Sequence, residues 1–157
     1  MQLSLRPAGD DDRTFCEDLN RRNMSAYLAS RQIRWDSGIY SASWSEFENL
    51  IILERTDAVG LIRLAHETDA LAIRDLQVLP EHQGRGIGSW AIQQALIIAA
   101  KRRTRLLRLR VYQESPARQL YARLGFNVQS VIGGTVHMAY ELPPNQSFKP
   151  NPLRGSA

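Results

Sequence analysis

A glycine-rich segment at residues 83–88, Gln-Gly-Arg-Gly-Ile-Gly, has the residue types of a phosphate-binding loop. It follows an apolar run that ends at Pro80 and precedes an apolar stripe with helical spacing, at Ile87, Ala91, Ala95 and Ile98. Glycines allow a ligand to approach the backbone closely, and the first N–H groups of a helix have no intrahelical partner. An anion bound there also interacts favourably with the helix dipole. We therefore expect this loop to bind a phosphorylated ligand.

Two other phosphate-binding loops do not fit the sequence. A dinucleotide-binding fingerprint needs G-x-G-x-x-G within a parallel βαβ series, with an acidic residue about 20 positions further on. The strands expected before residues 83–88 instead form an antiparallel meander. A P-loop needs Gly-Lys followed by Ser or Thr, and no such sequence follows here.

The elements that position this loop are expected in the order βαα-βββ-αβ-αββ. Apolar patterning and turn residues predict strands at 3–7, 49–55, 58–67, 70–79, 106–111, 126–132 and 135–142. Asp10 to Asp12 are expected to supply the N-cap and first-turn acids of a helix. Two more helices are expected at 86–103 and 116–124, whereas the boundaries within 23–45 stay open. Gly133-Gly134 predicts the turn of the last hairpin.

The composition is typical of one soluble globular domain of 157 residues, with 43% apolar and 23% charged residues. The apolar runs are shorter than the roughly 20 residues of a membrane span, so no membrane role is expected. An N-terminus without signal-peptide features and a single cysteine, Cys16, favour a cytoplasmic location. From residue 143 onward, Pro, Asn, Ser and Gly predict a flexible C-terminal tail of about 15 residues.

The net charge of +4 and a pI near 9.6 suggest an anionic partner, either nucleic acid or a phosphorylated small molecule. Almost all the basic residues are arginines, whose planar fork suits phosphate, although a codon bias would give the same count. A basic stretch includes Lys101, Arg102, Arg103, Arg105, Arg108 and Arg110. We interpret it as a solvated face and expect no nucleic-acid partner.

Two motifs resemble the GNAT superfamily of N-acetyltransferases, and the resemblance covers roughly residues 1–142. The signature Q/R-x-x-G-x-G/A is matched by Gln83, Gly86 and Gly88. A second signature, A-x-x-L-Y-x-x-x-G-F, is matched by Ala117, Leu120, Tyr121, Gly125 and Phe126. Both lie in the right order on the right expected elements. A weaker match to a bacterial subgroup of mostly unassigned substrates involves Asn23-Met24, Tyr27 and Trp35-Asp36.

The resemblance implies an α/β (α+β) GNAT fold, with a mixed, mostly antiparallel central sheet flanked by helices, in one domain at residues 1–142. It implies transfer of acetyl from acetyl-CoA to a primary amine of a small molecule or protein by direct attack, with no metal. The competing interpretation is a catalytically weak or inactive acetyl-CoA-binding sensor or regulatory protein. Related enzymes are often homodimers, and the sequence leaves the oligomeric state open.

The same resemblance assigns residues to the acetyl-CoA site. Backbone N–H groups of the loop would bind the pyrophosphate, and Arg85 would add a charged contact. The backbone of Val78 would pair with the pantetheine arm, while Ser115 would cap its helix and contact the same arm. Either Arg118 or Arg123, on the same helix, would approach the nucleotide phosphates. The implied set is Val78, Gln83, Gly84, Arg85, Gly86, Ile87, Gly88, Ser89, Ser115 and Arg118.

Catalysis must begin with an unprotonated amine, and a lysine-like amine of pKa about 10.4 is neutral in only about one molecule in 2,500 at pH 7. Tyr121 matches the family tyrosine that protonates the departing thiolate. Many relatives carry a glutamate base at positions corresponding to Ala72 or Arg74, which cannot serve. Strand alternation is expected to turn Asp75 to the face of the sheet opposite to Arg74, where it would form a structural ion pair. The remaining candidates for the base are Glu67, His66, His137 and water.

Acceptor recognition is expected to involve residues 23–44, because in this family the region after the first helix covers the site. Tyr27 and Trp35 would form walls of the acceptor pocket. Arg74, at a position where relatives have glutamate, would face the acceptor and favour a ligand with a carboxylate.

Overall fold

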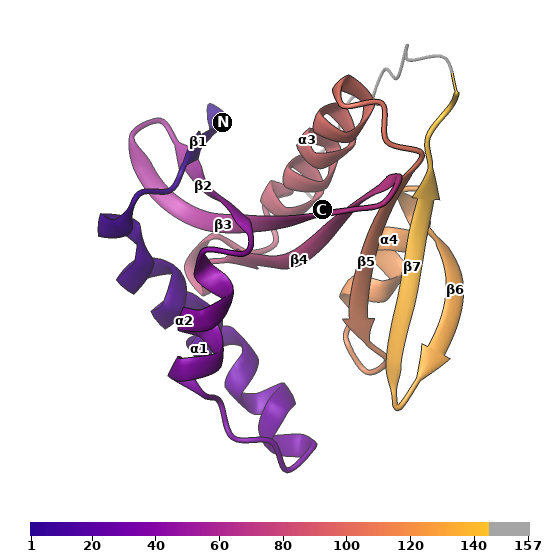
Figure 1. Cartoon of the computed structure of the whole chain (residues 1–157). Coiled ribbons are helices and arrows are strands. Elements are labelled where there is room, and N and C mark those ends of the chain that lie inside the picture. Colours follow the sequence, from indigo (N-terminus) through magenta and orange to yellow (C-terminus); the bar gives the residue numbers. More distant parts are fainter. Residues whose placement is uncertain (145–157) are drawn as a thin grey trace.

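Seven strands form one sheet in the order β1-β2-β3-β4-β5-β7-β6 in the computed structural model, which describes residues 1–144 (Figure 1). The strands are β1 (Leu3–Pro7), β2 (Glu48–Glu54), β3 (Asp57–Glu67), β4 (Ala70–Val78), β5 (Leu106–Tyr112), β6 (Asn127–Ile132) and β7 (Thr135–Glu141). Only the β4–β5 pair is parallel. The predicted mixed, mostly antiparallel sheet is therefore confirmed, and the predicted tail at 145–157 lies outside the described residues.

Tight turns connect the antiparallel strands at the places where the sequence predicts them. Gly133 and Gly134 both have positive φ values, 57° and 77°, as the two central residues of a type I′ hairpin turn require. Arg55 and Asp69 take the same left-handed conformation in the two turns of the meander. As a result, every predicted strand agrees with the observed one to within one residue at each end.

Four α-helices cover the sheet, two on each face. α3 (Ile87–Lys101) and α4 (Ala117–Arg123) contribute to a large core with the inward side chains of β2–β5 and β7. α1 (Arg13–Ser30) and α2 (Ser37–Trp44) pack on the other face, over a smaller core that includes Cys16, Leu19 and Tyr40. The unassigned region 23–45 is thus the end of α1, a short connection and α2. None of the helices in residues 1–144 is long and apolar enough to cross a bilayer.

Asp12 occupies the N-cap position of α1 as predicted, but the three acidic residues do not lie in the first turn of α1. Asp10–Asp12 form a short 3-10 helix that precedes α1, and the Asp12 side chain does not cap α1. Its carboxylate instead accepts hydrogen bonds from Arg6 Nη1 at 2.7 Å and from the Gly9 N–H at 2.8 Å. The ion pair anchors the start of α1 to β1, which a local capping pattern could not predict.

A buried arginine attaches α2 to the sheet. Arg63 in β3 is 3% exposed and donates hydrogen bonds to Asn49 Oδ1 at 2.7 Å and Ser43 Oγ at 2.9 Å. Its guanidinium also lies over the ring of Tyr40, at 4.3 Å from the centroid. These contacts hold α2 over the first half of the sheet. No helix of residues 1–144 lies over the second half of that face.

Candidate active site

Strands β4 and β5 separate halfway along their length. Their parallel pairing covers only Ala70–Ile73 against Leu106–Leu109, although β4 continues to Val78 and β5 to Tyr112. Figure 1 shows the two strands diverging beyond this point. The second half of β4 therefore has one edge that pairs with β3 and one edge that is open toward the gap.

The open edge of β4 presents backbone groups to this gap. The register pairs Val78 with Gly60, and the Leu79 N–H donates to the Val59 carbonyl at 2.9 Å. In an antiparallel ladder this pattern makes Val78 a non-hydrogen-bonded pair, so its own N–H and C=O point away from β3. The Val78 carbonyl accepts from Asn23 Nδ2 and Gln83 Nε2, each at 3.0 Å. The Val78 N–H thus faces the gap.

The glycine loop lies directly after β4 and starts α3. Gly84 and Gly86 have positive φ values of 74° and 84°, and Gly86 is the N-cap of α3 without a side-chain cap. The N–H groups of the first helical turn are therefore available to a ligand. A Cβ added at Gly84 or Gly88 would meet no atom within 4 Å, so the space beside the backbone is open. The geometry of this glycine cradle is that expected of the predicted phosphate-binding loop, and pyrophosphate binding stays a prediction.

The missing side chain of Gly88 and the buried hydroxyl of Ser89 are not required by the fold alone. The φ angle of Gly88 is not positive, so its helical backbone would accept any residue. Ser89 is 4% exposed, and its Oγ has no hydrogen-bond partner among residues 1–144. A missing side chain and an unpartnered hydroxyl on the first turn of α3 are both consistent with a bound ligand.

Arg85 points to β2 in this structure. Its Nη2 lies 3.0 Å from Glu54 Oε1, and its Nη1 lies 2.9 Å from His82 Nδ1. The Arg85 guanidinium is the main cause of the lowered pKa of Glu54. The charge of Arg85 is thus already paired, and its phosphate contact stays a prediction.

Tyr121 lies in α4 and packs against the large core. Its ring centroid is 6.2 Å from that of Phe126, and burial raises the pKa of the phenol from 10.0 to about 12. The hydroxyl has no hydrogen-bond partner among residues 1–144. A half-buried phenol with a free hydroxyl can donate a proton and stays protonated at neutral pH.

Two other predicted site residues, Ser115 and Arg118, lie at the start of α4. The Ala117 N–H donates to Ser115 Oγ at 3.3 Å, but the N-cap residue of α4 is Pro116, one position after Ser115. Arg118 is half-buried, and its guanidinium makes no ion pair within the described part of the chain. Their contacts with a cofactor stay predictions.

A β-bulge changes which face Asp75 occupies. Arg63 pairs with Asp75, but the next residue, Leu64, pairs with Ile73, so Arg74 is an extra residue in β4. The bulge reverses the alternation. Asp75 consequently shares the α1 side of the sheet with Ala72, and the prediction that it lies on the opposite face is wrong.

The predicted ion pair of Asp75 is also wrong, because its carboxylate accepts from amides. Asn20 Nδ2 donates to one oxygen at 2.8 Å and Gln77 Nε2 to the other at 2.9 Å. Burial raises the pKa of Asp75, more than these two hydrogen bonds lower it. The network continues from Asn20 Oδ1, which accepts from Trp35 Nε1 at 2.9 Å.

The raised pKa of Asp75 predicts a pH dependence of stability. Between the ordinary value of 3.8 and the raised folded value, the folded protein binds more protons than the unfolded chain, so stability falls as pH rises through this window. Relative to Asp75→Asn, the wild type should therefore lose free energy of unfolding as pH rises above about 4 and then level off. Urea unfolding at a series of pH values measures this. Parallel curves for the two proteins would contradict the prediction.

The two predicted aromatic walls lie in different places. Tyr27 faces the gap, with its ring centroid 5.8 Å from that of Tyr112 at the end of β5. Trp35 packs against Tyr40, at 6.1 Å between centroids, and belongs to the small core under α1 and α2. We therefore expect Tyr27 to contact ligands and Trp35 to support the Asn20–Asp75 contact.

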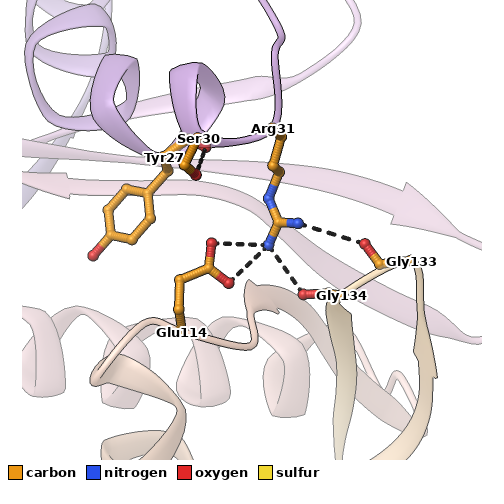
Figure 2. A network of polar contacts seen from close by, with 6 residues as sticks. All are labelled: Tyr27, Ser30, Arg31, Glu114, Gly133 and Gly134. Atoms are coloured by element: carbon orange, nitrogen blue, oxygen red, sulfur yellow. Dashed lines mark hydrogen bonds and ion pairs between the residues drawn. The ribbon is translucent and has the colours of Figure 1, made fainter.

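The end of α1 is bound to the opposite side of the gap. Figure 2 shows Arg31, just after α1, donating from Nη2 to both Glu114 carboxylate oxygens, at 3.1 and 2.9 Å, and to the Gly134 carbonyl at 3.1 Å. Its guanidinium also stacks over Tyr112, at 4.0 Å from the centroid. Arg31 therefore links α1 to the β6–β7 turn and to the loop after β5.

An open groove of about 410 Å³ lies on the helix-free part of the α1 side of the sheet. We call it the arginine groove and define it by Glu67, Ala72, Arg74, Arg108, Arg110 and His137. Two of the candidate bases, Glu67 and His137, line it. His66 does not, because its ring lies beside Glu48 and Arg102.

Arg108 and Arg110 line the arginine groove, although the sequence predicts only a basic surface for them. The alternation of Leu107, Arg108, Leu109 and Arg110 in β5 was the available signal, since Leu107 and Leu109 are buried in the large core. Other members of that basic stretch are neutralised locally: Arg102 pairs with Glu48 at 2.8 Å and Arg105 with Asp69 at 2.9 Å.

Comparison with known proteins identifies the class to which this fold and site belong. The family model described as acetyltransferase (GNAT) domain matches residues 46–128, more than half of the chain. The chain therefore belongs to the GNAT acetyltransferase family.

Individual relatives are distant. The [ribosomal protein bS18]-alanine N-acetyltransferase of Haemophilus influenzae is 25% identical over 96 residues, which are 60% of this chain and 66% of that protein, just under two thirds of its length. The crystal structure of PaiA N-acetyltransferase from Thermoplasma acidophilum with coenzyme A has a TM-score of 0.73 and 20% identity, and covers 90% of this chain and 100% of that one. The crystal structure of spermidine N-acetyltransferase from Vibrio cholerae with CoA and spermine has a TM-score of 0.71 and 22% identity. The match covers 89% of this chain and 95% of that one.

Proposed function

We propose that this protein transfers the acetyl group of acetyl-CoA to a primary amine. The observation that carries the proposal is the gap between β4 and β5, with the Val78 N–H on its edge and the glycine cradle at its end. An extended pantetheine arm can pair with the open edge of β4 as an added strand does. The pyrophosphate would then lie at the start of α3, where N–H groups and the helix dipole favour it.

Direct attack would use groups that lie around the gap. A new N–C bond forms as the amine attacks the thioester carbonyl, and the C–S bond breaks to release CoA. The Val78 N–H can donate to the carbonyl oxygen as negative charge develops on it. Tyr121 would give its proton to the departing sulfur, provided that the phenol lies close to it.

The proton lost by the amine requires an acceptor at the groove. Glu67 accepts hydrogen bonds from Arg74 and Arg108, each at 3.2 Å, and lines the groove. His137, on β7, faces the same groove. Either side chain could take the proton, directly or through a water molecule.

Thiol release tests the function. The protein is mixed with acetyl-CoA and a panel of amines, and free CoA is measured with a thiol reagent while calorimetry measures CoA binding. We expect CoA to bind and at least one amine to give turnover. Binding without turnover on any amine would favour the sensor interpretation, and absence of binding would contradict both.

A further inference from the structure

The arginine groove is more positive than its internal ion pairs can balance. Three guanidinium groups, from Arg74, Arg108 and Arg110, surround one carboxylate, Glu67. Glu67 pairs with Arg74 and Arg108 at 3.2 Å each. Arg110 has no ion pair or hydrogen bond through its side chain within residues 1–144. Burial, and then the charge of Arg74, lower the pKa of Arg110, and the negative charge of Glu67 offsets this only in part.

The groove begins where the two strands separate. Ile73 and Leu109 form the last parallel pair of β4 and β5, and the next residues on the two strands are Arg74 and Arg110. Both arginines line the groove together with Ala72. A ligand bound by these guanidiniums would thus lie at the closed end of the gap, beside the position that the proposed function gives to the thioester.

We propose that the groove binds a carboxylate of a small amine acceptor, which makes acidic amines the preferred substrate class; this inference rests on the proposed acetyltransferase function. A guanidinium binds a carboxylate through two parallel N–H···O bonds, so Arg110 can position as well as attract the ligand. A volume of about 410 Å³ is that of a small-molecule site.

The same charges disfavour polycations. The Vibrio cholerae relative was crystallised with CoA and spermine, a polyamine. In this chain a second ammonium group in the groove would face Arg74 and Arg110, and like charges at close range are repulsive. Nucleic acid fits less well than a small acid, because Arg102 and Arg105 outside the groove are already paired with carboxylates.

Matched acceptors of equal chain length test the proposal. We compare γ-aminobutyrate, butylamine and putrescine as acceptors with saturating acetyl-CoA, and add a short peptide with an acidic N-terminal residue. We expect kcat/KM of the wild type to be at least about tenfold higher for γ-aminobutyrate than for butylamine, with putrescine the poorest, since one charge-assisted bidentate contact contributes at least that factor.

Variants connect the preference to the groove. In Arg110→Gln the ratio of kcat/KM for γ-aminobutyrate over butylamine should fall toward one, through a higher KM for the acid. Arg105→Gln is the matched control, because Arg105 is an exposed arginine that pairs with Asp69 outside the groove. Its ratio should equal that of the wild type.

Three results would overturn the inference: no preference for the acid in the wild type, the same preference in Arg110→Gln, or turnover of the peptide alone. A failure of the proposed function appears differently, as CoA binding with no turnover of any amine. In that case a thermal-shift titration with γ-aminobutyrate still tests whether the groove binds a carboxylate. Stabilisation of the wild type but not of Arg110→Gln supports binding there, and equal responses of the two proteins refute it.

Discussion

Replacing Tyr121 with phenylalanine should lower kcat by about a hundredfold or more and leave the affinity for CoA nearly unchanged. General acid catalysis contributes on this scale, and Phe lacks only the proton donor. The hydroxyl has no hydrogen-bond partner among residues 1–144, so its loss should change the free energy of unfolding by less than about 0.5 kcal/mol. Steady-state thiol release gives kcat, and calorimetry gives the Kd for CoA.

The pKa of Tyr121 adds a second expectation. Because burial raises it to about 12, the phenol keeps its proton throughout the usual assay range. The deprotonation of Tyr121 should therefore cause no loss of kcat between about pH 6 and pH 9.

Tyr40→Phe is the matched control for the Tyr121 substitution. Tyr40 is also a tyrosine whose hydroxyl has no partner within residues 1–144, but it is buried in the small core on the α1 side. Its substitution should leave kcat at the wild-type value. If Tyr121→Phe also kept the wild-type kcat, Tyr121 would be removed from the proton transfer.

Gly88→Ala should weaken CoA binding by about tenfold or more without destabilising the fold. The added methyl group meets no protein atom within 4 Å, so any steric conflict must be with a ligand beside the first turn of α3. Displacement of one charge-assisted hydrogen bond costs about 1.5–3 kcal/mol, and 1.4 kcal/mol corresponds to a factor of ten. Because Ala is a better helix former than Gly, the melting temperature should be unchanged or higher.

The corresponding control is Gly9→Ala. Gly9 is exposed, and a Cβ there also meets nothing within 4 Å, but it lies at the end of β1 away from the cradle. Its Kd for CoA should match the wild type. An unchanged Kd in Gly88→Ala would mean that the phosphates do not contact this part of α3.

Local patterns in the sequence were sufficient for the parts of the site that short-range interactions define. Glycines between a strand and a helix predict a loop with an uncapped helix start, and Gly84 and Gly86 have the positive φ values that such a loop needs. The A-x-x-L-Y pattern similarly predicts a helix that carries Tyr121. These features depend on residues within a few positions of one another, and a single sequence contains that information.

The face of the sheet on which Asp75 lies could not be predicted from local patterns. Its position on the α1 side depends on the bulge at Arg74, which arises from the pairing of β4 with β3 rather than from the residues of β4 alone. The partners in ion pairs likewise depend on contacts between segments that are distant in the sequence. Arg85 bonds to Glu54, 31 positions earlier, and Arg31 to Glu114, 83 positions later.

The sequence by itself therefore determined the strands, the glycine loop and the helix of Tyr121, because backbone preference and apolar periodicity are local. Only the tertiary structure decided where β4 and β5 separate, that Arg74, Arg108 and Arg110 share one groove, and that Trp35 packs against Tyr40 and donates to Asn20. Each of these depends on the register between distant strands or on which side chains meet across the sheet, and strand register is an outcome of the whole fold.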